Sequence, residues 1–520
     1  MKDYDTTVAF LGQWGRFQLI FFFLLCSTIV PNGLGAFTLI FLTDVPSHQC
    51  LVSDTNITED WRKSIIPVEV KLSSCSRYRL DVVRNLSALG YIPGRDVNLT
   101  DLEQEGCVDG WSYSKDIYQS TIVSEFDLVC TDQWKRPFTT LVFFLGVLFG
   151  SVFSGQLSDR YGRKPVLFAT MAVQTVFVFV QAFATSWVVF IVLLFFNGLA
   201  QINYLSALVL GAEVLTGNER VLFSSLGSCL SFAIGYMTLP LFAYFLRDWK
   251  SLLYALSVPS VVFIPESPRW LISQGRVEEA EAILRKAAKW NKVQVPKTIF
   301  EDCNVTKTRT HSKEQYTVLD LLRLRSVRAT TLIVCLFSLC VGYFGLSFNA
   351  AQLHGDPYIS CFLAAVVEIP AYISSWVALR YFPRRLSLVG CFLLGAMPLF
   401  FIQLVPEDLP NLSLTLELVG KYAFTTGISL IFAYVAELYP TVLRNTATGI
   451  CMAVSRMGSC ISPFVLNLRV YFTFLPYIIL GALAVLSAFA TLFLSESFKQ
   501  PLPETIQQEV TSLFYKIEQS

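Results

Sequence analysis

The chain has 520 residues, of which 53% are hydrophobic and 15% are charged, whereas soluble globular domains average about 25% charged residues. The formal net charge is +1, and no long block of one sign suggests a nucleic acid or an acidic partner surface. Because the missing charge falls in long apolar segments, the composition predicts an all-α polytopic membrane protein embedded in a lipid bilayer.

Twelve apolar runs come near the roughly 20 residues that a helix needs to cross a bilayer. The first is too long for the core of a signal peptide and is not followed by a small-residue cleavage site, so we expect it to remain as a helix. The sixth would extend only about 21 Å against a hydrocarbon core near 30 Å, so it does not span comfortably. The runs cover about 19–42, 138–158, 165–185, 187–212, 221–245, 251–264, 330–348, 357–379, 386–405, 414–436, 446–466 and 473–494.

A polar loop, residues 43–137, separates the first two runs and holds four of the 13 cysteines. Clustered cysteines indicate an oxidising compartment and two disulfides, for which three pairings are possible. Three Asn-x-Ser/Thr glycan acceptors in the same loop favour an extracellular or lumenal position. A zinc site is the alternative, but the loop has no Cys-x-x-Cys pair. The cysteines are Cys50, Cys75, Cys107 and Cys130, and the acceptors are Asn56, Asn85 and Asn98.

A short basic turn, Gly155-Gln-Leu-Ser-Asp-Arg-Tyr-Gly-Arg-Lys164, follows the second run. Its glycines and cations suit a tight cytoplasmic turn, where short loops collect Lys and Arg, and Pro165 is a good first residue for the next helix. The pattern G-x-L-x-D-R-x-G-R-K resembles the loop between helices two and three of the major facilitator superfamily.

The distribution of cations predicts the orientation of the chain. Twelve spans put both termini on one side, and Lys and Arg collect in the turns on that side, which we therefore expect to be cytoplasmic. Within the long central segment, apolar residues recur at helical spacing from Val277 to Ala287, which predicts an amphipathic linking helix. The expected parts are a first six-helix half, 1–265, which includes the outer loop, a cytoplasmic linker, 266–329, a second half, 330–498, and a cytoplasmic tail, 499–520.

The two halves repeat three markers in the same order. An acid followed by an arginine comes after the fourth run of each half, Pro265-Glu-Ser267 is echoed by Ser495-Glu-Ser497, and the basic turn is echoed by Pro383-Arg-Arg385. This repeat predicts a major facilitator fold, with twelve helices in two pseudo-symmetric halves that rock around a central substrate. The charges either anchor helix ends or also pair across a cytoplasmic gate. The gate candidates are Asp159, Arg163, Glu213, Arg220, Glu437 and Arg444.

Further motifs narrow the resemblance. Phe10-Leu-Gly-Gln-Trp-Gly-Arg-Phe17, Pro265-Glu-Ser-Pro-Arg-Trp270 and Ala436-Glu-Leu-Tyr-Pro-Thr441 resemble the organic cation, anion and zwitterion transporter family, over nearly the whole chain. Val30-Pro-Asn-Gly33 and Val367-Glu-Ile-Pro-Ala-Tyr372 are most similar to its carnitine and zwitterion branch. The resemblance implies a transporter at the plasma membrane. Members of the family are several residues longer just before the Pro-Glu-Ser-Pro-Arg-Trp motif than this chain is.

Arg456 lies near the middle of the eleventh run, where a guanidinium costs at least about 2.5–3.5 kcal/mol. The carboxylate of a substrate would match its planar fork, and a structural pair with Glu368 is the alternative. In the family that the chain resembles, anion and zwitterion carriers have arginine at the matching place, whereas cation carriers have aspartate.

A quaternary ammonium is attracted to aromatic faces by roughly 0.5–2 kcal/mol each. With 43 phenylalanines in the chain, any single ring is more often packed or lipid-facing, so only the family pattern selects candidates. These are Tyr204, Tyr343, Phe344, Phe432 and Tyr434.

Sodium prefers oxygen ligands, and Asn32, Gln201 and Asn203 offer amide oxygens inside membrane runs. The resemblance links these positions to sodium coupling in the carnitine branch. Amides in membrane helices also bridge helices by hydrogen bonds, which is the alternative. No other cofactor or metal is expected.

No enzymatic signature occurs, because Gly211-Ala-Glu-Val-Leu-Thr-Gly217 lacks the Lys-Ser/Thr of a phosphate-binding loop and the three histidines form no ligand cluster. We therefore predict a sodium-dependent carrier of small zwitterions or organic cations, such as carnitine, that works by alternating access. An organic anion exchanger is one alternative. A non-transporting, sensor-like relative is another, because the sixth run is short. The oligomeric state stays open.

Overall fold

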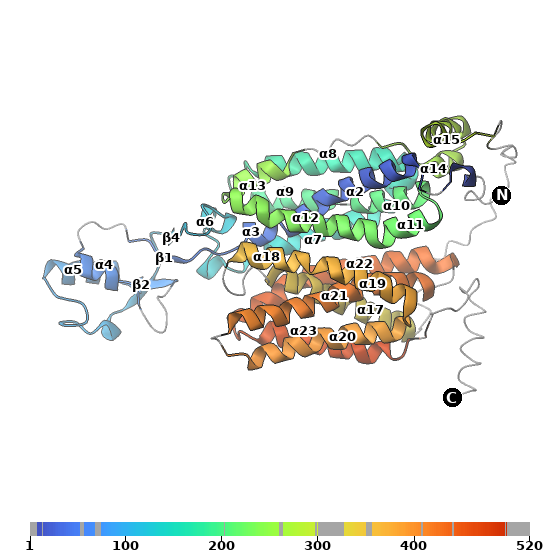
Figure 1. Cartoon of the computed structure of the whole chain (residues 1–520). Helices are drawn as coiled ribbons and strands as arrows, with labels where there is room; N and C mark the ends of the chain where they lie inside the picture. Colours follow the sequence, from blue (N-terminus) through green and yellow to red (C-terminus); the bar gives the residue numbers. More distant parts are fainter. Residues whose placement is uncertain are drawn as a thin grey trace.

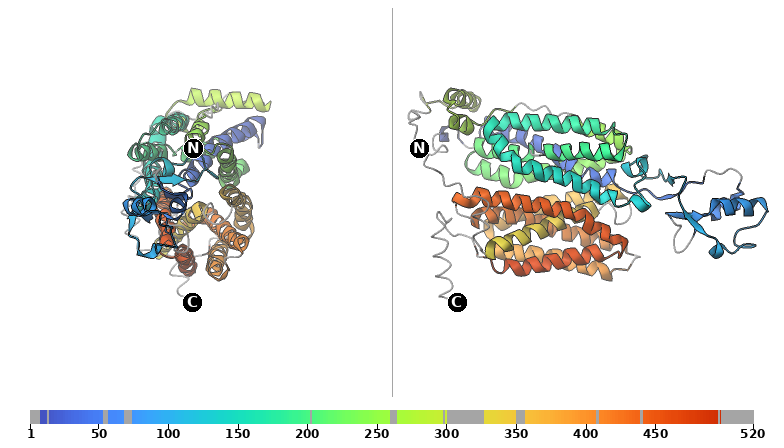
Figure 2. Two further views of the ribbon diagram at one scale, coloured as in Figure 1. Left: turned by 90° about the vertical axis from the view of Figure 1, so that its left-hand side faces the viewer. Right: turned by 180° about the vertical axis from the view of Figure 1, so that it is seen from behind.

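The computed structural model describes residues 8–12, 14–52, 57–67, 74–201, 203–258, 264–296, 299, 327–349, 356–406, 409–438, 441–494 and 496. Its helices form two halves that lie side by side, and a small domain projects from one end of the bundle (Figure 1). Figure 2 shows the same division from the end and from behind. The glycan acceptor Asn56, the side chains of Glu437 and Arg444, and the tail 499–520 lie outside the described residues.

The first half follows the apolar runs closely. A short 3-10 turn, η1, precedes its first long helix, and the fourth run carries α9 and α10, with Gln201 in a turn after α9. A π-helical turn, η4, interrupts the fifth run. The elements are η1 (Ala9–Leu11), α2 (Arg16–Phe37), α3 (Leu39–Leu42), α7 (Lys135–Tyr161), α8 (Arg163–Gln181), α9 (Trp187–Ala200), α10 (Asn203–Val214), α11 (Gly217–Leu222), η4 (Phe223–Gly227), α12 (Ser228–Phe245) and α13 (Trp249–Leu256).

The second half occupies runs seven to twelve. Counting both halves, eight helical stretches of the described residues are long and apolar enough to cross a membrane. The described residues also include two shorter apolar helices, Ile333–Asn349 and Leu475–Thr491. The elements are α17 (Val327–Asn349), α18 (Pro357–Val366), α19 (Glu368–Tyr381), α20 (Arg384–Phe401), η6 (Ile402–Leu404), α21 (Pro410–Leu438), α22 (Thr441–Asn467), η7 (Leu468–Val470) and α23 (Leu475–Thr491).

The sixth run is short in the structure as well. Helix α13 has eight residues, which correspond to about 12 Å of helix, and Asp248 caps its first turn by accepting from the Ser251 N–H at 3.0 Å. Beyond Val258 the next described residue is Ile264, which is buried. The described part of α13 alone therefore does not cross a bilayer.

The projecting domain is built by the polar loop. The four cysteines form two disulfides, Cys50–Cys107 and Cys75–Cys130, and the glycan acceptors Asn85 and Asn98 are exposed. His48 lies close to the sulfur atoms of the second disulfide, but oxidised sulfur offers no thiolate to a metal. The elements are β1 (His48–Cys50), α4 (Glu59–Ser64), β2 (Ser76–Tyr78), α5 (Leu80–Ala88), η2 (Leu99–Asp101), β3 (Gln104–Gly106), β4 (Trp111–Tyr113), α6 (Ile122–Glu125) and η3 (Cys130–Asp132), with antiparallel pairs β1–β4 and β2–β3. The end of the helix bundle from which this domain projects is called the disulfide end.

The opposite end carries the linker helices α14 (Pro268–Ser273) and α15 (Val277–Asn291) and is called the linker end (Figure 1). Helix α15 is the amphipathic helix that the sequence predicts, and it buries Ala280, Leu284 and Ala287. Asn291 at its end accepts from the Phe17 N–H at 2.9 Å and donates to the Leu11 carbonyl at 3.1 Å. The linker helix is therefore attached to the first half.

Two helix pairs of the first half cross at glycines. Gly33 of α2 lies against Gly235 of α12, and a methyl group on either would overlap a main-chain carbonyl oxygen of the other helix. Gly146 of α7 and Gly198 of α9 are related in the same way. Small residues let helix backbones approach closely in membranes, so both pairs are packed backbone against backbone.

Candidate functional site

A cavity of about 370 Å³ lies between the two halves. Helices α2, α7, α10 and α12 line it from the first half, and α17, α19, α21 and α22 line it from the second. A site shared by both halves is the position that a rocking carrier requires. The sequence-predicted residues that line it are Asn32, Gln201, Tyr204, Tyr343, Phe344, Phe432 and Arg456.

Arg456 is half-buried on α22 and borders this cavity. Among the described residues its guanidinium forms no ion pair. The alternative prediction, a structural pair between Arg456 and Glu368, is wrong in this conformation, because the partner of Glu368 is Lys421. A guanidinium at this depth without a carboxylate partner can receive the carboxylate of a ligand.

Aromatic rings form much of the remaining wall. Tyr343 and Phe344 of α17 meet edge to face with ring centres 5.0 Å apart, and Phe344 lies 4.8 Å from Phe144 of the first half. Phe432 borders the cavity, but Tyr434, two residues along α21, is fully buried and does not line it. The described cavity therefore includes four of the five predicted aromatic residues.

A buried ion pair of the second half lies beside the cavity and contacts the first half. The Lys421 Nζ atom lies 3.3 Å from Glu368 Oε1, which also accepts from the Tyr343 hydroxyl at 2.8 Å. The same ammonium lies 4.3 Å from the ring centre of Tyr236 and 5.8 Å from that of Phe37, both in the first half. Cation–π attraction thus supplements the charge pair at the boundary between the halves.

Of the three amides predicted for sodium, Gln201 and Asn203 lie where α9 ends and α10 begins, and Asn32 lies on α2. Gln201 follows the last residue of α9 and lines the central cavity together with Asn32. Asn203 opens α10, donates to Gln174 Oε1 at 2.7 Å, and lines a separate cavity of about 50 Å³. The Oδ1 atoms of Asn32 and Asn203 are buried and accept no hydrogen bond within the described part of the chain. Two amide oxygens are therefore available to a cation, although they border different cavities.

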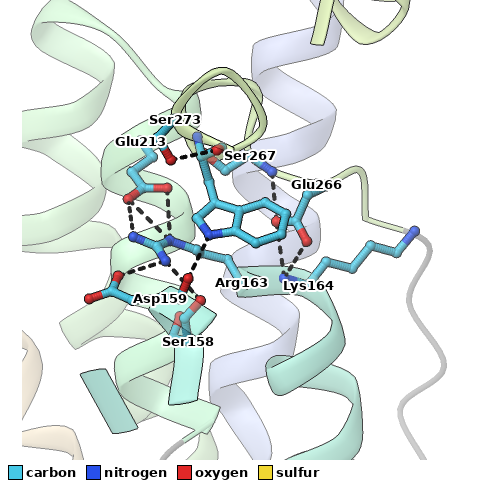
Figure 3. Close-up of polar contacts among 9 residues, drawn as sticks. Ser158, Asp159, Arg163, Lys164, Glu213, Glu266, Ser267 and Ser273 are labelled. Atoms are coloured by element: carbon cyan, nitrogen blue, oxygen red, sulfur yellow. Dashed lines mark hydrogen bonds and ion pairs between the residues drawn. The ribbon is translucent and has the colours of Figure 1, made fainter. Parts of the chain in front are cut away.

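Three of the predicted gate charges, Asp159, Arg163 and Glu213, pair with one another at the linker end of the first half (Figure 3). Arg163 contacts Glu213 at 2.9 Å and Asp159 at 2.7 Å, and the Trp270 indole donates to the Asp159 carbonyl at 3.0 Å. Arg220 donates through Nε to the carbonyl of Leu215 at 2.9 Å. Asp159, Arg163 and Glu213 thus anchor a turn of one half, while the side chains of Glu437 and Arg444 lie outside the described residues.

The sequence repeat is also a repeat of contacts. Glu266 accepts from the Lys164 N–H at 3.2 Å at the start of α8 (Figure 3). Glu496 accepts from the Arg384 and Arg385 N–H groups at 2.8 and 3.0 Å at the start of α20. Carboxylates stabilise helix N-termini, so the same device closes the basic turn in both halves.

Gly162 is the position of this turn that is most sensitive to substitution. Its φ of 102° with ψ of 157° is a conformation that side chains rarely adopt, and a methyl group there would lie 2.8 Å from Glu266 Oε2. We expect Gly162→Ala to destabilise the protein by about 1–3 kcal/mol, measured as a lower midpoint of thermal unfolding of the purified protein. Gly390→Ala is the control, because Gly390 lies in α20 with open space around its Cα. Equal midpoints for the two variants would contradict this expectation.

The sequence analysis missed the charged residues of α21. Lys421 and Glu417 are fully buried, and Glu417 accepts from Asn349 at 3.0 Å and from the Tyr477 hydroxyl at 3.1 Å. The signal was present, because a charge inside an apolar run such as 414–436 is by default a candidate functional residue.

Comparison with known proteins identifies the superfamily to which the chain belongs. Residues 137–463, well over half of the chain, match the family model of the Major Facilitator Superfamily, and the chain belongs to this superfamily. The solved structure of the proton:xylose symporter XylE bound to 6-bromo-6-deoxy-D-glucose matches with a TM-score of 0.57 over 95% of this chain and 99% of that chain. At 16% identity this likeness concerns the fold, and it confirms the predicted architecture.

Proteins of similar sequence identify the branch of the superfamily to which the chain belongs. Organic cation/carnitine transporter 2 of Rattus norvegicus is 51% identical over 98% of this chain and 94% of that protein. Its counterpart in Homo sapiens is 50% identical, as is Solute carrier family 22 member 4 of Mus musculus. Within the superfamily, the chain belongs to the organic cation/carnitine transporter branch. It is a multi-pass membrane transporter, and since this family is not enzymatic, the prediction that the chain is not an enzyme is confirmed.

Proposed function

We propose that this chain is a sodium-dependent secondary transporter that carries a small zwitterion, with carnitine as the first candidate, across the plasma membrane by alternating access. The observation that carries the proposal is the guanidinium of Arg456 at a cavity that four of the predicted aromatic residues also line. A zwitterion with a quaternary ammonium offers a carboxylate to the Arg456 guanidinium and a cation to the aromatic rings.

The cavity provides for both ends of such a substrate. The carboxylate binds the planar fork of Arg456 in two parallel hydrogen bonds. The ammonium lies against Tyr204, Tyr343, Phe344 or Phe432, where ring faces attract it. A simple organic cation would leave Arg456 without a counter-charge, so a zwitterion fits the described residues better.

We propose that sodium binds the side-chain amides of Asn32, Gln201 and Asn203. The buried Oδ1 atoms of Asn32 and Asn203 lack donors among the described residues, and neutral oxygen ligands suit a hard monovalent cation. Because Asn32 and Gln201 also border the central cavity, an ion there would change the field that the substrate meets.

The proposal places the disulfide end outside the cell, with glycan on Asn85 and Asn98, and both termini in the cytoplasm. At that end the Tyr358 hydroxyl of α18 donates to the Ile117 carbonyl at 3.1 Å, and its ring stacks on Phe41 at 5.5 Å. These contacts join the halves, so this conformation is closed toward the outside.

The test is uptake of labelled carnitine by cells that express the chain, with sodium or with sodium replaced by N-methyl-D-glucamine. We expect uptake in sodium to exceed uptake in the replacement medium by at least about tenfold, which corresponds to about 1.4 kcal/mol of coupling. Surface biotinylation reports whether the protein reaches the plasma membrane. Absence of carnitine uptake by a protein that is present at the surface would refute the proposal.

A second candidate is a protein that binds such substrates without moving them, and the short helix α13 is the observation that favours it. It predicts that purified protein binds labelled carnitine although expressing cells accumulate none. An organic anion exchanger, in contrast, would show sodium-independent uptake of a dicarboxylate.

A further inference from the structure

A second large cavity, of about 280 Å³, lies at the disulfide end, where α7 begins. It shares no lining residue with the central cavity. Arg136 of α7 lines it from the first half, and Arg469 of η7 lines it from the second. Two cationic side chains from opposite halves thus border one space, which is far larger than the roughly 10–15 Å³ that a single water needs.

Neither guanidinium forms an ion pair with the described residues, although Asp44 interacts electrostatically with Arg136 and Glu417 with Arg469. Arg136 donates through Nε to the carbonyl of Thr43 at 3.2 Å, and Arg469 donates through Nη1 to Asn349 Oδ1 at 3.4 Å. Both acceptors are uncharged, and no ion pair of either arginine occurs in the described part of the chain. Most of the ten N–H donors of the two forks are therefore free for a ligand.

The carboxylates of this region are engaged by other donors. Asp44 accepts from the Tyr118 hydroxyl at 2.7 Å and from the Val45 N–H at 3.0 Å. Burial raises the pKa of the Asp44 carboxyl, whereas Tyr118, the Val45 N–H and Arg136 favour its charged form. Glu417 is held by Asn349 and Tyr477, as described above.

Like charges that face one space repel each other, and the repulsion is strongest where protein walls exclude part of the solvent. An anion between the two forks would convert this repulsion into two charge-assisted attractions. Because the two arginines belong to different halves, such an anion would also join the halves at the end that is closed here.

We propose that this cavity binds a small monovalent anion, a halide or a carboxylate group, between Arg136 and Arg469. The bound anion stabilises the conformation in which the disulfide end is closed, since it has two partners only when both halves contribute. The site is independent of the central cavity and does not rest on the identity of the transported substrate.

The test is thermal unfolding of the full-length protein in lipid nanodiscs, at constant ionic strength, with sodium HEPES as the reference salt. Replacing HEPES by chloride or acetate at about ten times the dissociation constant or more is expected to raise the unfolding midpoint by about 2–4 °C. The shift should disappear in Arg136→Ala and in Arg469→Ala. It should persist in Arg247→Ala, which removes a cation at the same end that does not line the cavity.

Lysine variants keep the experiment decisive if an alanine variant fails to fold. Arg136→Lys and Arg469→Lys retain the charge but lose the planar fork, and a reduced shift is expected for each. The proposal is overturned if wild-type protein shows no anion-dependent shift, or if either alanine variant shows the wild-type shift.

Two sources of the anion can be separated in the same assay. A shift with chloride alone would assign an inorganic ion, whereas shifts with acetate and with glycine betaine would assign the carboxylate of an organic solute. The betaine measurement uses Arg456→Ala, so that binding at the central cavity does not contribute. A negative result in this anion-binding experiment would not bear on whether the chain takes up carnitine. The two proposals can therefore be refuted independently.

Discussion

Replacing Arg456 by alanine is expected to abolish uptake of a zwitterion while the protein still reaches the cell surface. The substrate carboxylate would lose its only described cationic partner in the central cavity and remain unpaired there. Removing one member of a desolvated, hydrogen-bonded charge pair costs about 2–5 kcal/mol, which corresponds to a loss of roughly 30- to 5,000-fold in transport efficiency. Membrane insertion should not suffer, because the variant removes a charge that is costly to bury.

Uptake of labelled carnitine per surface protein is the measurement. Arg456→Lys should retain a fraction of the activity, since it keeps the charge but not the fork. Met457→Ala is the matched control, because the neighbouring side chain is exposed and does not line the cavity. Uptake by Arg456→Ala within threefold of wild type would exclude Arg456 as the carboxylate partner.

Breaking the buried pair of Glu368 and Lys421 is expected to have the second large effect, on stability. Either Glu368→Ala or Lys421→Ala leaves the other charge uncompensated among buried side chains. The expected loss is about 3–5 kcal/mol, as found for other buried pairs from which one member is removed. The measurement is the midpoint of thermal unfolding of the purified protein in detergent.

The double variant Glu368→Gln with Lys421→Met separates charge from packing. It removes both charges at nearly constant volume, and replacement of a buried pair by uncharged residues is often neutral or stabilising. We therefore expect its midpoint near that of wild type. If the double variant were as unstable as the single ones, an uncompensated charge would not account for the loss of stability, because the glutamine amide oxygen can still accept from the Tyr343 hydroxyl.

The fold was predictable because its signals are local. Membrane spans are continuous apolar runs, and the turns are marked by glycine, proline and charge at fixed places. Glu266 and Glu496 could be matched in the sequence because each follows the last run of its half, and both close a basic turn in the structure. Arg456, which lines the central cavity, could be selected as a candidate for a related reason, since a cation within an apolar run is by default a candidate functional residue.

Side-chain direction and helix neighbours were not predictable. Phe432 lines the cavity and Tyr434 does not, because two residues along a helix turn the side chain by about 200° and a uniformly apolar run does not fix that rotation. Likewise, the pairing of Lys421 with Glu368 depends on which helices are adjacent within the second half. Sequence spacing carries no information on that adjacency.

The glycine crossings have a mechanical consequence. Helices that touch backbone to backbone have no side-chain layer between them to deform, so the pairs at Gly33 with Gly235 and at Gly146 with Gly198 make the first half stiff. The contact between the halves is softer, because side chains such as those of Phe144 and Phe344, which meet edge to face, form a layer between the backbones. If the proposed alternating access moves the halves relative to each other, the contact between them would therefore deform first, while the first half would move as a stiff unit.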